Sequence, residues 1–346
     1  MQLAPLLKDG HTNIYPPEEL SSKFFSRPPL QTTLIENKVL VTRVGSTRLN
    51  TLVDVGDEIV DVDGMPVHSY AERHVSPFVS SSTPQHRSVR QYSYQLLHGD
   101  ENKAVKLRLK GRSGVMREVI LPRKGYDDLV SPTRFDFRLL KGNIAYISID
   151  HFESDAGVEA FESALPSILK ARGLIIDVRN NGGGSSGFGT RILRMLTNAP
   201  IRGPNSYSRG DNGLSRNNGD VIEWRPTLFS GGSDKQTRPV VFSGPVTVLT
   251  GPKTFSAAED FVAAFQTAAR GRTVGGATGG STGQPIMVKL PGGGAGRICA
   301  KRDTFANGKT FVGKGLTPDI PVSQTLADFY AGRDTVLDRA VAELVR

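Results

Sequence analysis

The sequence is poor in cysteine, because Cys299 is the only one in 346 residues. A single cysteine cannot form a disulfide within the chain, so it does not identify the redox compartment. Long hydrophobic runs are also missing, and no segment approaches the ~18 apolar residues that a membrane-spanning helix needs. The first ten residues, MQLAPLLKDG, become polar too soon for a signal peptide. The sequence therefore predicts no membrane span.

Charge of one sign is not concentrated anywhere. The 43 Lys and Arg exceed the 34 Asp and Glu to give a net charge of +9, but no block of like charges or basic stripe with aromatics occurs. We therefore predict no nucleic-acid partner. The mild positive charge is compatible with acidic peptides or with the carboxylate at the end of a chain.

Signals for metals and cofactors are weak. No histidine stands in metal-ligand spacing with Cys, Asp or Glu, so we predict no metal site. Gly182, Gly184 and Gly187 spell G-x-G-x-x-G, but no acidic residue lies between Gly187 and Asp211 to bind a ribose. We therefore predict no nucleotide and no other cofactor.

Changes of pattern divide the chain into three segments, and its length suggests about two domains. Residues 1–33 are interrupted by prolines, which prevent long regular elements. Residues 34–123 show short runs of alternating apolar and polar residues, which predict a small β-rich domain. Strands and helices alternate in residues 124–346, which predicts an α/β domain.

Apolar periodicity predicts the individual elements. The expected strands are 39–44, a hairpin within 56–67 that turns at Asp63-Gly64, 103–111, 117–123, 143–149, 173–179 and 246–252. The expected helices are 157–171, a segment near 189–197, 256–269 and 334–345. Residues 202–237 are expected to form an irregular loop.

Ser256 is a candidate nucleophile, because it stands where the strand 246–252 gives way to a helix. Backbone N–H groups and the helix dipole at such a position stabilise developing negative charge. Glu259 follows three positions later, however, and S-x-x-E is also the capping box, in which the serine only satisfies helix donors. The local sequence leaves both interpretations open.

Two other segments carry candidate chemistry. The glycines 182–184 follow a strong strand, and glycines let a backbone approach a substrate closely and direct N–H groups at an oxyanion. His11, in the segment DGHT, has a side chain that can accept and return a proton near neutral pH. A lone histidine in a polar turn is more often a solvated residue.

Seven motifs follow one another along nearly the whole chain: DGHT, GDEIVDVDG, YISIDHF, IIDVRNNGGG, VTVLTGPKTFSAAE, GRTVGGATGG and GKGLTPDIPV. In this order they resemble the tail-specific, or C-terminal processing, protease family, and most closely its tricorn-like branch. The resemblance implies a crotonase/ClpP-like catalytic domain at 124–346 and an inserted PDZ-like module at 34–123. It implies serine endopeptidase activity on unfolded or C-terminally exposed polypeptides, and an exported, periplasmic or extracellular location. It leaves the oligomeric state open.

The resemblance also implies roles for individual residues. Ser256 matches the nucleophile, and the N–H of Ala257 matches one donor of the oxyanion hole. Gly183, or its neighbour Gly184, matches the second donor.

The general base separates two branches of the family. In members with a Ser–Lys dyad the lysine would stand at position 281, where this chain has Ser281. The tricorn-like branch uses a histidine from a D-G-H-T segment, which His11 matches.

Two departures from the family pattern bear on His11. Val312 stands where a glutamate is expected to orient the histidine, and the sequence leaves open whether Asp9, Glu18, Glu19, Asp319 or a water molecule replaces it. Only eight residues precede Asp9, where relatives have a helical region, which raises the alternative that the chain is a fragment. These departures leave two alternatives open, namely a peptide-binding pseudoprotease and a ligand-binding or acyl-transfer protein on the same scaffold.

Overall fold

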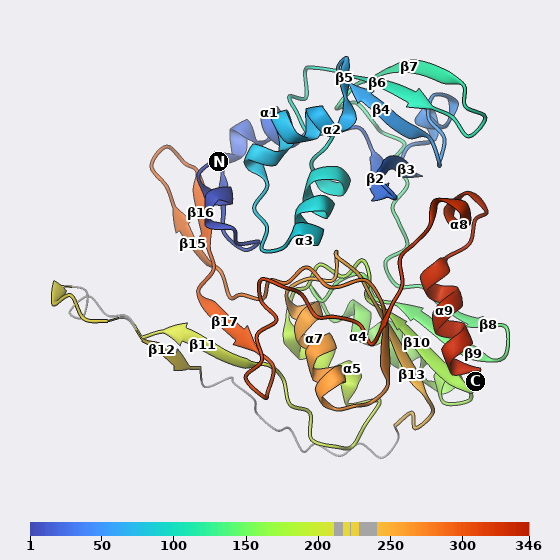
Figure 1. The fold of residues 1–346 in the computed structure, drawn as a ribbon, viewed down its shortest axis with the longest axis vertical. Coiled ribbons are helices and arrows are strands. Elements are labelled where there is room, and N and C mark those ends of the chain that lie inside the picture. The colour runs from blue at the N-terminus through green and yellow to red at the C-terminus, as the bar shows by residue number, and fades with distance from the viewer. Residues whose placement is uncertain (211–216, 222, 228–240, 346) are drawn as a thin grey trace. The chain divides into compact units, whose positions relative to one another are not determined.

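The computed structural model describes residues 1–210, 217–221, 223–227 and 241–345 (Figure 1). It has a mixed α/β architecture with several sheets, as the sequence predicts. Two compact units are formed from discontinuous segments. Unit 1 comprises Met1–Thr133, Met287–Arg297 and Gln324–Thr335, and unit 2 comprises Arg134–Ile286, Ile298–Ser323 and Val336–Arg346. Within the described residues no helix is both long and apolar enough to cross a bilayer.

Unit 1 contains an antiparallel sheet in the order β2-β3-β4-β6-β7, with β5 paired to β4. The strands are β2 (Leu30–Ile35), β3 (Lys38–Val44), β4 (Glu58–Val62), β5 (Met65–Pro66), β6 (Val105–Lys110) and β7 (Met116–Leu121). Alternation is clear in β6, where Val105, Leu107 and Leu109 are fully buried between exposed polar residues. The predicted hairpin turn is confirmed, because Asp63 and Gly64 both have positive φ.

Helical turns separate β5 from β6 in unit 1. They are α2 (Val67–Tyr70), η4 (Ala71–Val75), η5 (Ser76–Phe78), α3 (Pro84–Ser88) and η6 (Val89–Tyr94). The expectation of a β-rich domain therefore needs correction over 67–94. These elements follow one another without a break over 67–78 and over 84–94, and the π-helical parts η4 and η6 depart from a regular 3.6-residue period. Tertiary packing stabilises them. Ala71, Val75 and Tyr92, for example, pack into the core under the sheet.

Residues 1–33 form only short elements, as their prolines predict. These are η1 (Ala4–Leu7), β1 (Asn13–Tyr15), η2 (Glu18–Leu20), α1 (Ser21–Phe25) and the start of β2. Another short element, η3 (Thr47–Thr51), lies between β3 and β4. Strand β1 pairs with β16 (Ala295–Ile298), which also pairs with β15 (Ile286–Lys289).

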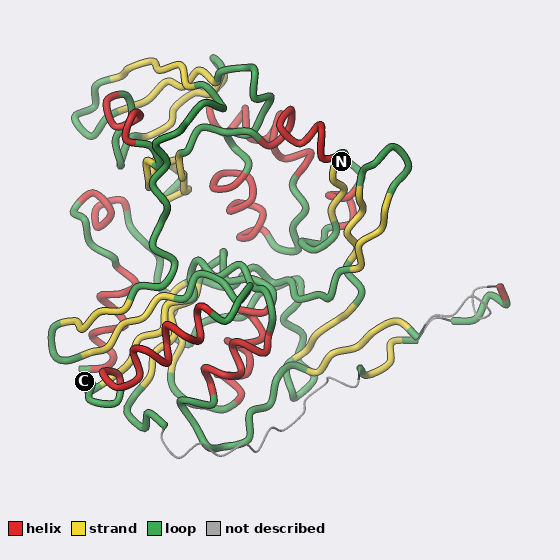
Figure 2. The backbone as a smooth tube through the Cα atoms, turned by 180° about the vertical axis from the view of Figure 1, so that it is seen from behind, coloured by secondary structure: helices red, strands yellow, loops and turns green. Residues whose placement is uncertain are grey.

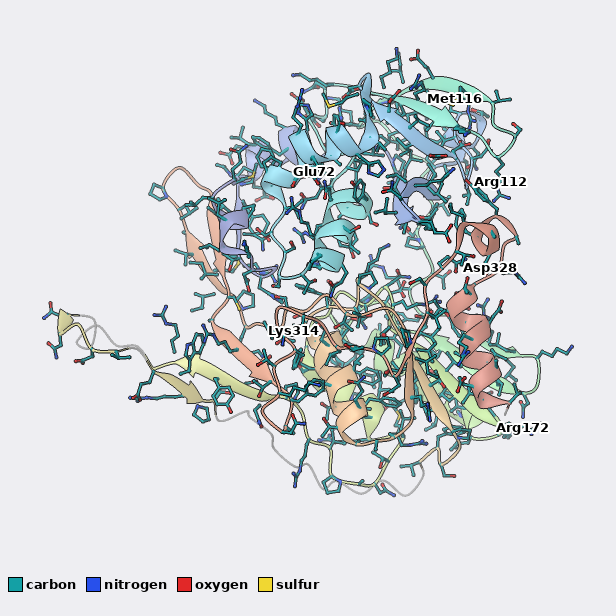
Figure 3. All side chains as sticks on the ribbon, in the orientation of Figure 1. Glu72, Arg112, Met116, Arg172, Lys314 and Asp328 are labelled. Carbon is teal, nitrogen blue, oxygen red and sulfur yellow. The ribbon has the colours of Figure 1, made fainter. Side chains whose placement is uncertain are left out.

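Helix α8 (Leu326–Tyr330) also belongs to unit 1, although it lies near the end of the sequence. Figure 3 labels Asp328 in this helix and Arg112 in the turn between β6 and β7. Arg112 Nη1 donates to the Tyr330 carbonyl at 3.3 Å, and its guanidinium lies 5.4 Å from the Tyr330 ring. A hydrogen bond and a cation–π contact thus fix the helix within the unit.

Unit 2 is built on a sheet in the order β18-β14-β13-β10-β9-β8. Its strands are β8 (Phe137–Leu140), β9 (Ile144–Ser148), β10 (Gly173–Asp177), β13 (Val246–Thr250), β14 (Arg272–Gly275) and β18 (Ile320–Pro321). All neighbours pair in parallel except β8 with β9. The strands predicted at 143–149, 173–179 and 246–252 are therefore confirmed as the centre of a parallel sheet.

Helices cover both faces of this sheet, as Figure 2 shows from behind. On one face, residues such as Ile147, Ile176 and Val248 pack with α4 (Ala156–Ile168), α5 (Ser186–Leu193) and α7 (Ala257–Thr267). On the other face, Ile175 and Leu249 pack with α9 (Thr335–Leu344). Burial on both faces explains why these strands are continuous apolar runs.

A second small sheet of unit 2 corrects one expectation. Strands β11 (Asn205–Arg209) and β12 (Trp224–Pro226) pair with each other, and β11 also pairs with β17 (Lys301–Thr304). The segment 202–237 is thus partly a hairpin, whose strands are mostly polar, partly buried and without clear apolar alternation. The parts of it at 211–216, 222 and 228–237 lie outside the described residues.

Candidate active site

Ser256 is held in an unusual backbone conformation at the head of α7. Its φ is 57° and its ψ is −125°, whereas a serine that only caps a helix has extended backbone angles. A non-glycine residue in such a conformation costs on the order of 1–3 kcal/mol, and these residues cluster at active sites. The conformation therefore favours a nucleophile over a simple cap.

The structure brings the glycine turn against Ser256. Gly183 has a φ of 100°, and a Cβ added there would lie 2.7 Å from Ser256 Cβ and 3.0 Å from the Ala257 nitrogen. Gly184 has a φ of 133°, and a Cβ there would overlap the Phe152 carbonyl oxygen at 1.9 Å. Neither position has room for a side chain. Three predicted site residues, Ser256, Ala257 and Gly183, thus lie together in unit 2.

Asn181 connects this turn to the residue before the serine, which the sequence reasoning missed. Its Nδ2 donates to the Ile149 carbonyl and its Oδ1 accepts from the Gly183 N–H, both at 2.9 Å. Its own carbonyl accepts from the Phe255 N–H at 3.0 Å. The side chain is fully buried. The paired asparagines before the glycines were the only sequence signal for it.

The buried side chain of Glu259 holds the backbone of Ser256 in place. The predicted capping box is present, and in it the Ser256 N–H donates to Glu259 Oε2 at 3.2 Å. The carboxylate also accepts from Thr278 Oγ1 at 2.6 Å, from the Gly280 N–H at 2.8 Å and from the Ser281 N–H at 2.9 Å. The side chain has no solvent exposure, and this burial raises the pKa of Glu259 to about 7.

Charged residues gather where the central strands end. Asp177, at the end of β10, accepts from Arg179 Nη2 at 2.6 Å and from Tyr146 Oη at 2.9 Å. Asp150 follows β9, and burial together with the charge of Asp177 raises its pKa to about 6. Lys253 follows β13, and burial lowers its pKa while the charge of Asp150 opposes this. Ser256 and the glycine turn follow the same strand ends, where open α/β sheets bind ligands.

His11 lies in unit 1 and is buried, with 1% of its surface exposed. The alternative of a solvated turn histidine is therefore wrong. Asp9 Oδ1 accepts from the His11 N–H at 2.8 Å and from Thr12 Oγ1 at 3.0 Å, so Asp9 orders the backbone of the turn. The Gly10 N–H donates to Ser82 Oγ at 3.0 Å. The role of His11 toward Ser256, in the other unit, stays a prediction.

The residues considered as groups that orient His11 differ in their surroundings. Val312 is partly buried against the core of unit 2. Asp319 Oδ2 accepts from the Thr273 N–H at 2.7 Å and from its Oγ1 at 2.8 Å, so this carboxylate anchors β14. Glu18 and Glu19 open η2 in unit 1.

Comparison with known proteins identifies the family. Residues 143–322, just over half of the chain, match peptidase family S41, and the chain belongs to this family of serine peptidases. The family predicted from the motif order and the class of enzyme are thereby confirmed.

Solved structures agree in fold. Mature CPAF complexed with lactacystin matches with a TM-score of 0.75 and 17% identity, over 99% of this chain and 87% of that chain. The photosystem II D1 C-terminal processing protease has a TM-score of 0.52 and 22% identity, over 93% and 80%. A candidate peptidase from Parabacteroides merdae has a TM-score of 0.50 and 28% identity, over 64% and 67%. No curated protein matches.

Proposed function

We propose that this serine peptidase is an endopeptidase that hydrolyses unfolded or C-terminally exposed polypeptides, with Ser256 as its nucleophile. The observation that carries the proposal is the strained Ser256, which stands at the head of α7 against the glycine at 183. Its hydroxyl attacks a peptide carbonyl, and an acyl-enzyme forms as the amine leaves. Water then hydrolyses the acyl-enzyme and restores the serine.

The oxyanion is held by backbone N–H groups. Ala257 is the first residue of α7, where the helix dipole adds to its N–H. The second donor is the N–H of Gly183, shared with Asn181 Oδ1, or else that of Gly184. Both glycines belong to the turn beside the nucleophile.

His11 is proposed as the general base, which takes the proton from Ser256 and returns it to the leaving amine. Two observations support this choice. Position 281 holds a serine and not a lysine, and His11 is buried in a turn that Asp9 orders. We assign a crotonase-like catalytic domain to 124–346 and a PDZ-like peptide-binding module to 34–123. The parallel sheet in the former and the antiparallel sheet in the latter support the assignment.

A fluorophosphonate probe tests the nucleophile directly. We expect one probe per chain, attached to Ser256, because only an activated serine reacts readily with such a reagent. Mass spectrometry of the labelled peptide identifies the residue, and Ser281→Ala serves as the control that should still label. A wild-type protein that binds casein peptides but takes up no probe would instead be a pseudoprotease.

The turn around His11 can be tested through Asp9. Asp9→Ala removes the acceptor of the His11 backbone N–H and of Thr12 Oγ1, so the turn that carries the imidazole should loosen. A misplacement of about 1 Å in a catalytic group can lower a rate by ~10²-fold, and we expect a loss of roughly 10- to 100-fold in probe labelling. Asp9→Asn keeps the Oδ1 acceptor and should label nearly as fast as wild type. Equal rates for Asp9→Ala and wild type would argue against His11 as the base.

A further inference from the structure

Unit 1 contains a cavity of about 160 Å³ that the peptidase chemistry does not use. Its wall comes from β1, α1 and the helical turns that follow β5. Several aromatic side chains line the wall, namely Tyr15, Phe24, Phe25, Tyr70 and Phe78. An apolar cavity of ~150 Å³ holds a benzene molecule, so this cavity accommodates a body of the size of one aromatic ring.

Arg90 gives the cavity a cationic group. Its side chain lines the cavity, and its Nε is buried with no hydrogen-bond partner within the described part of the chain. No aspartate or glutamate is among the described residues of the wall. A guanidinium keeps its charge in a protein, and a buried charge without an anion is costly. The described wall of the cavity therefore supplies no anionic acceptor for Arg90.

The surroundings of Arg90 also favour an anion in the cavity. His98 lies in the same wall, and burial first, then the charges of Arg27 and Arg90, lower its pKa to about 4. Glu72, labelled in Figure 3, is turned to other partners: Gln91 Nε2 donates to it at 3.0 Å and Arg87 lies 3.5 Å away. Its side chain is 63% exposed. The local field at the cavity is thus positive and is not neutralised by this neighbouring carboxylate.

We propose that this cavity binds a small free monocarboxylic acid with a ring-sized apolar body. The carboxylate accepts hydrogen bonds from Arg90, and the body packs among the aromatic side chains. The inference is independent of the peptidase mechanism, because none of the residues proposed for catalysis, Ser256, His11 and the oxyanion-hole donors, belongs to the wall.

The test compares benzoate with benzamide, which have the same shape and differ in charge. Calorimetric titration of the full chain carrying Ser256→Ala should show one benzoate bound, with benzamide at least about tenfold weaker, since hydrogen bonds to a charged group are worth that much. Because the variant has no nucleophile, failure of the proposed peptidase function does not affect the result. Equal affinities for the two ligands, or no saturable binding of benzoate, would overturn the proposal.

Two variants and one further ligand sharpen the result. Arg90→Met keeps an apolar wall and should abolish the preference for benzoate. Arg87→Met removes a half-exposed arginine from the neighbouring α3 and should leave the preference unchanged. Acetyl-glycyl-phenylalanine separates a free acid from the end of a peptide chain. Binding of this dipeptide as tightly as benzoate would contradict the assignment to a free acid.

Discussion

Replacing Ser256 with alanine is expected to lower kcat/KM for casein cleavage by at least ~10³-fold, because loss of a catalytic serine removes the covalent route altogether. The neighbouring Gly183 has no side chain that could replace the hydroxyl. The free energy of unfolding should change by about 1 kcal/mol or less, the typical effect of losing a helix N-cap side chain. Rates of fluorescent casein hydrolysis and urea unfolding curves measure the two quantities.

A glycine at the same position separates strain from chemistry. Ser256→Gly removes the hydroxyl too, but glycine adopts a φ of 57° without the penalty that serine or alanine incurs. It should be inactive, and yet more stable than Ser256→Ala by about 1 kcal/mol. A Ser256→Ala protein that cleaves casein as fast as wild type would show that the nucleophile is elsewhere.

The parallel sheet of unit 2 was predictable because its strands are buried on both faces. Runs such as Ile147 with its neighbours in β9, and Ile176 in β10, consist almost wholly of apolar residues bounded by polar turns. The helices α4, α5 and α7 carry apolar residues at helical spacing, and their bounds differ from the predicted ones by a few residues. Strong local periodicity and the global fold agree in this part of the chain.

Features that depend on distant segments were not predictable. The helical stretches 67–78 and 84–94 contain π-helical turns without a regular 3.6-residue period. Unit 1 also includes 287–297 and 324–335, far along the chain. Strands β11 and β12 are polar, so the hairpin had no period-2 signal. Long-range pairing decides such elements, and local propensity only permits them.

The candidate site was predicted in part. Consecutive glycines in a sequence indicate that the backbone lies close to another group, so Gly183 could be connected with an oxyanion hole from the sequence alone. The positive φ of Ser256 left no trace in the sequence, because serine ordinarily avoids that conformation. Asn181 bonds to Ile149, 32 positions away, and Thr278 bonds to Leu316, 38 positions away. Only the folded chain shows which donors they meet.

Glu259 should make the stability of the protein depend on pH. Its pKa is about 7 in the folded chain, against an ordinary value of 4.5, so the folded state holds the proton more tightly than the unfolded state. This contribution is fully present below pH 4.5 and is lost as the pH rises through 7. A shift of that size corresponds to about 3 kcal/mol. The glutamine of Glu259→Gln cannot titrate, so the free energy of unfolding of this variant should lack this part of the decline with rising pH.

The same variant should also disturb the nucleophile. A glutamine presents one oxygen and an NH2 group to four donors, so two of them, such as the N–H groups of Ser256 and Ser281, lose their acceptor. We expect a loss of about 2–5 kcal/mol at pH 5, where wild type is protonated, and a smaller difference at pH 8. Probe labelling should fall roughly tenfold as Ser256 shifts. Glu162→Gln, a half-exposed glutamate of α4, is the matched control. A stability difference between Glu259→Gln and wild type that stays constant from pH 5 to 8 would show that Glu259 does not titrate in this range.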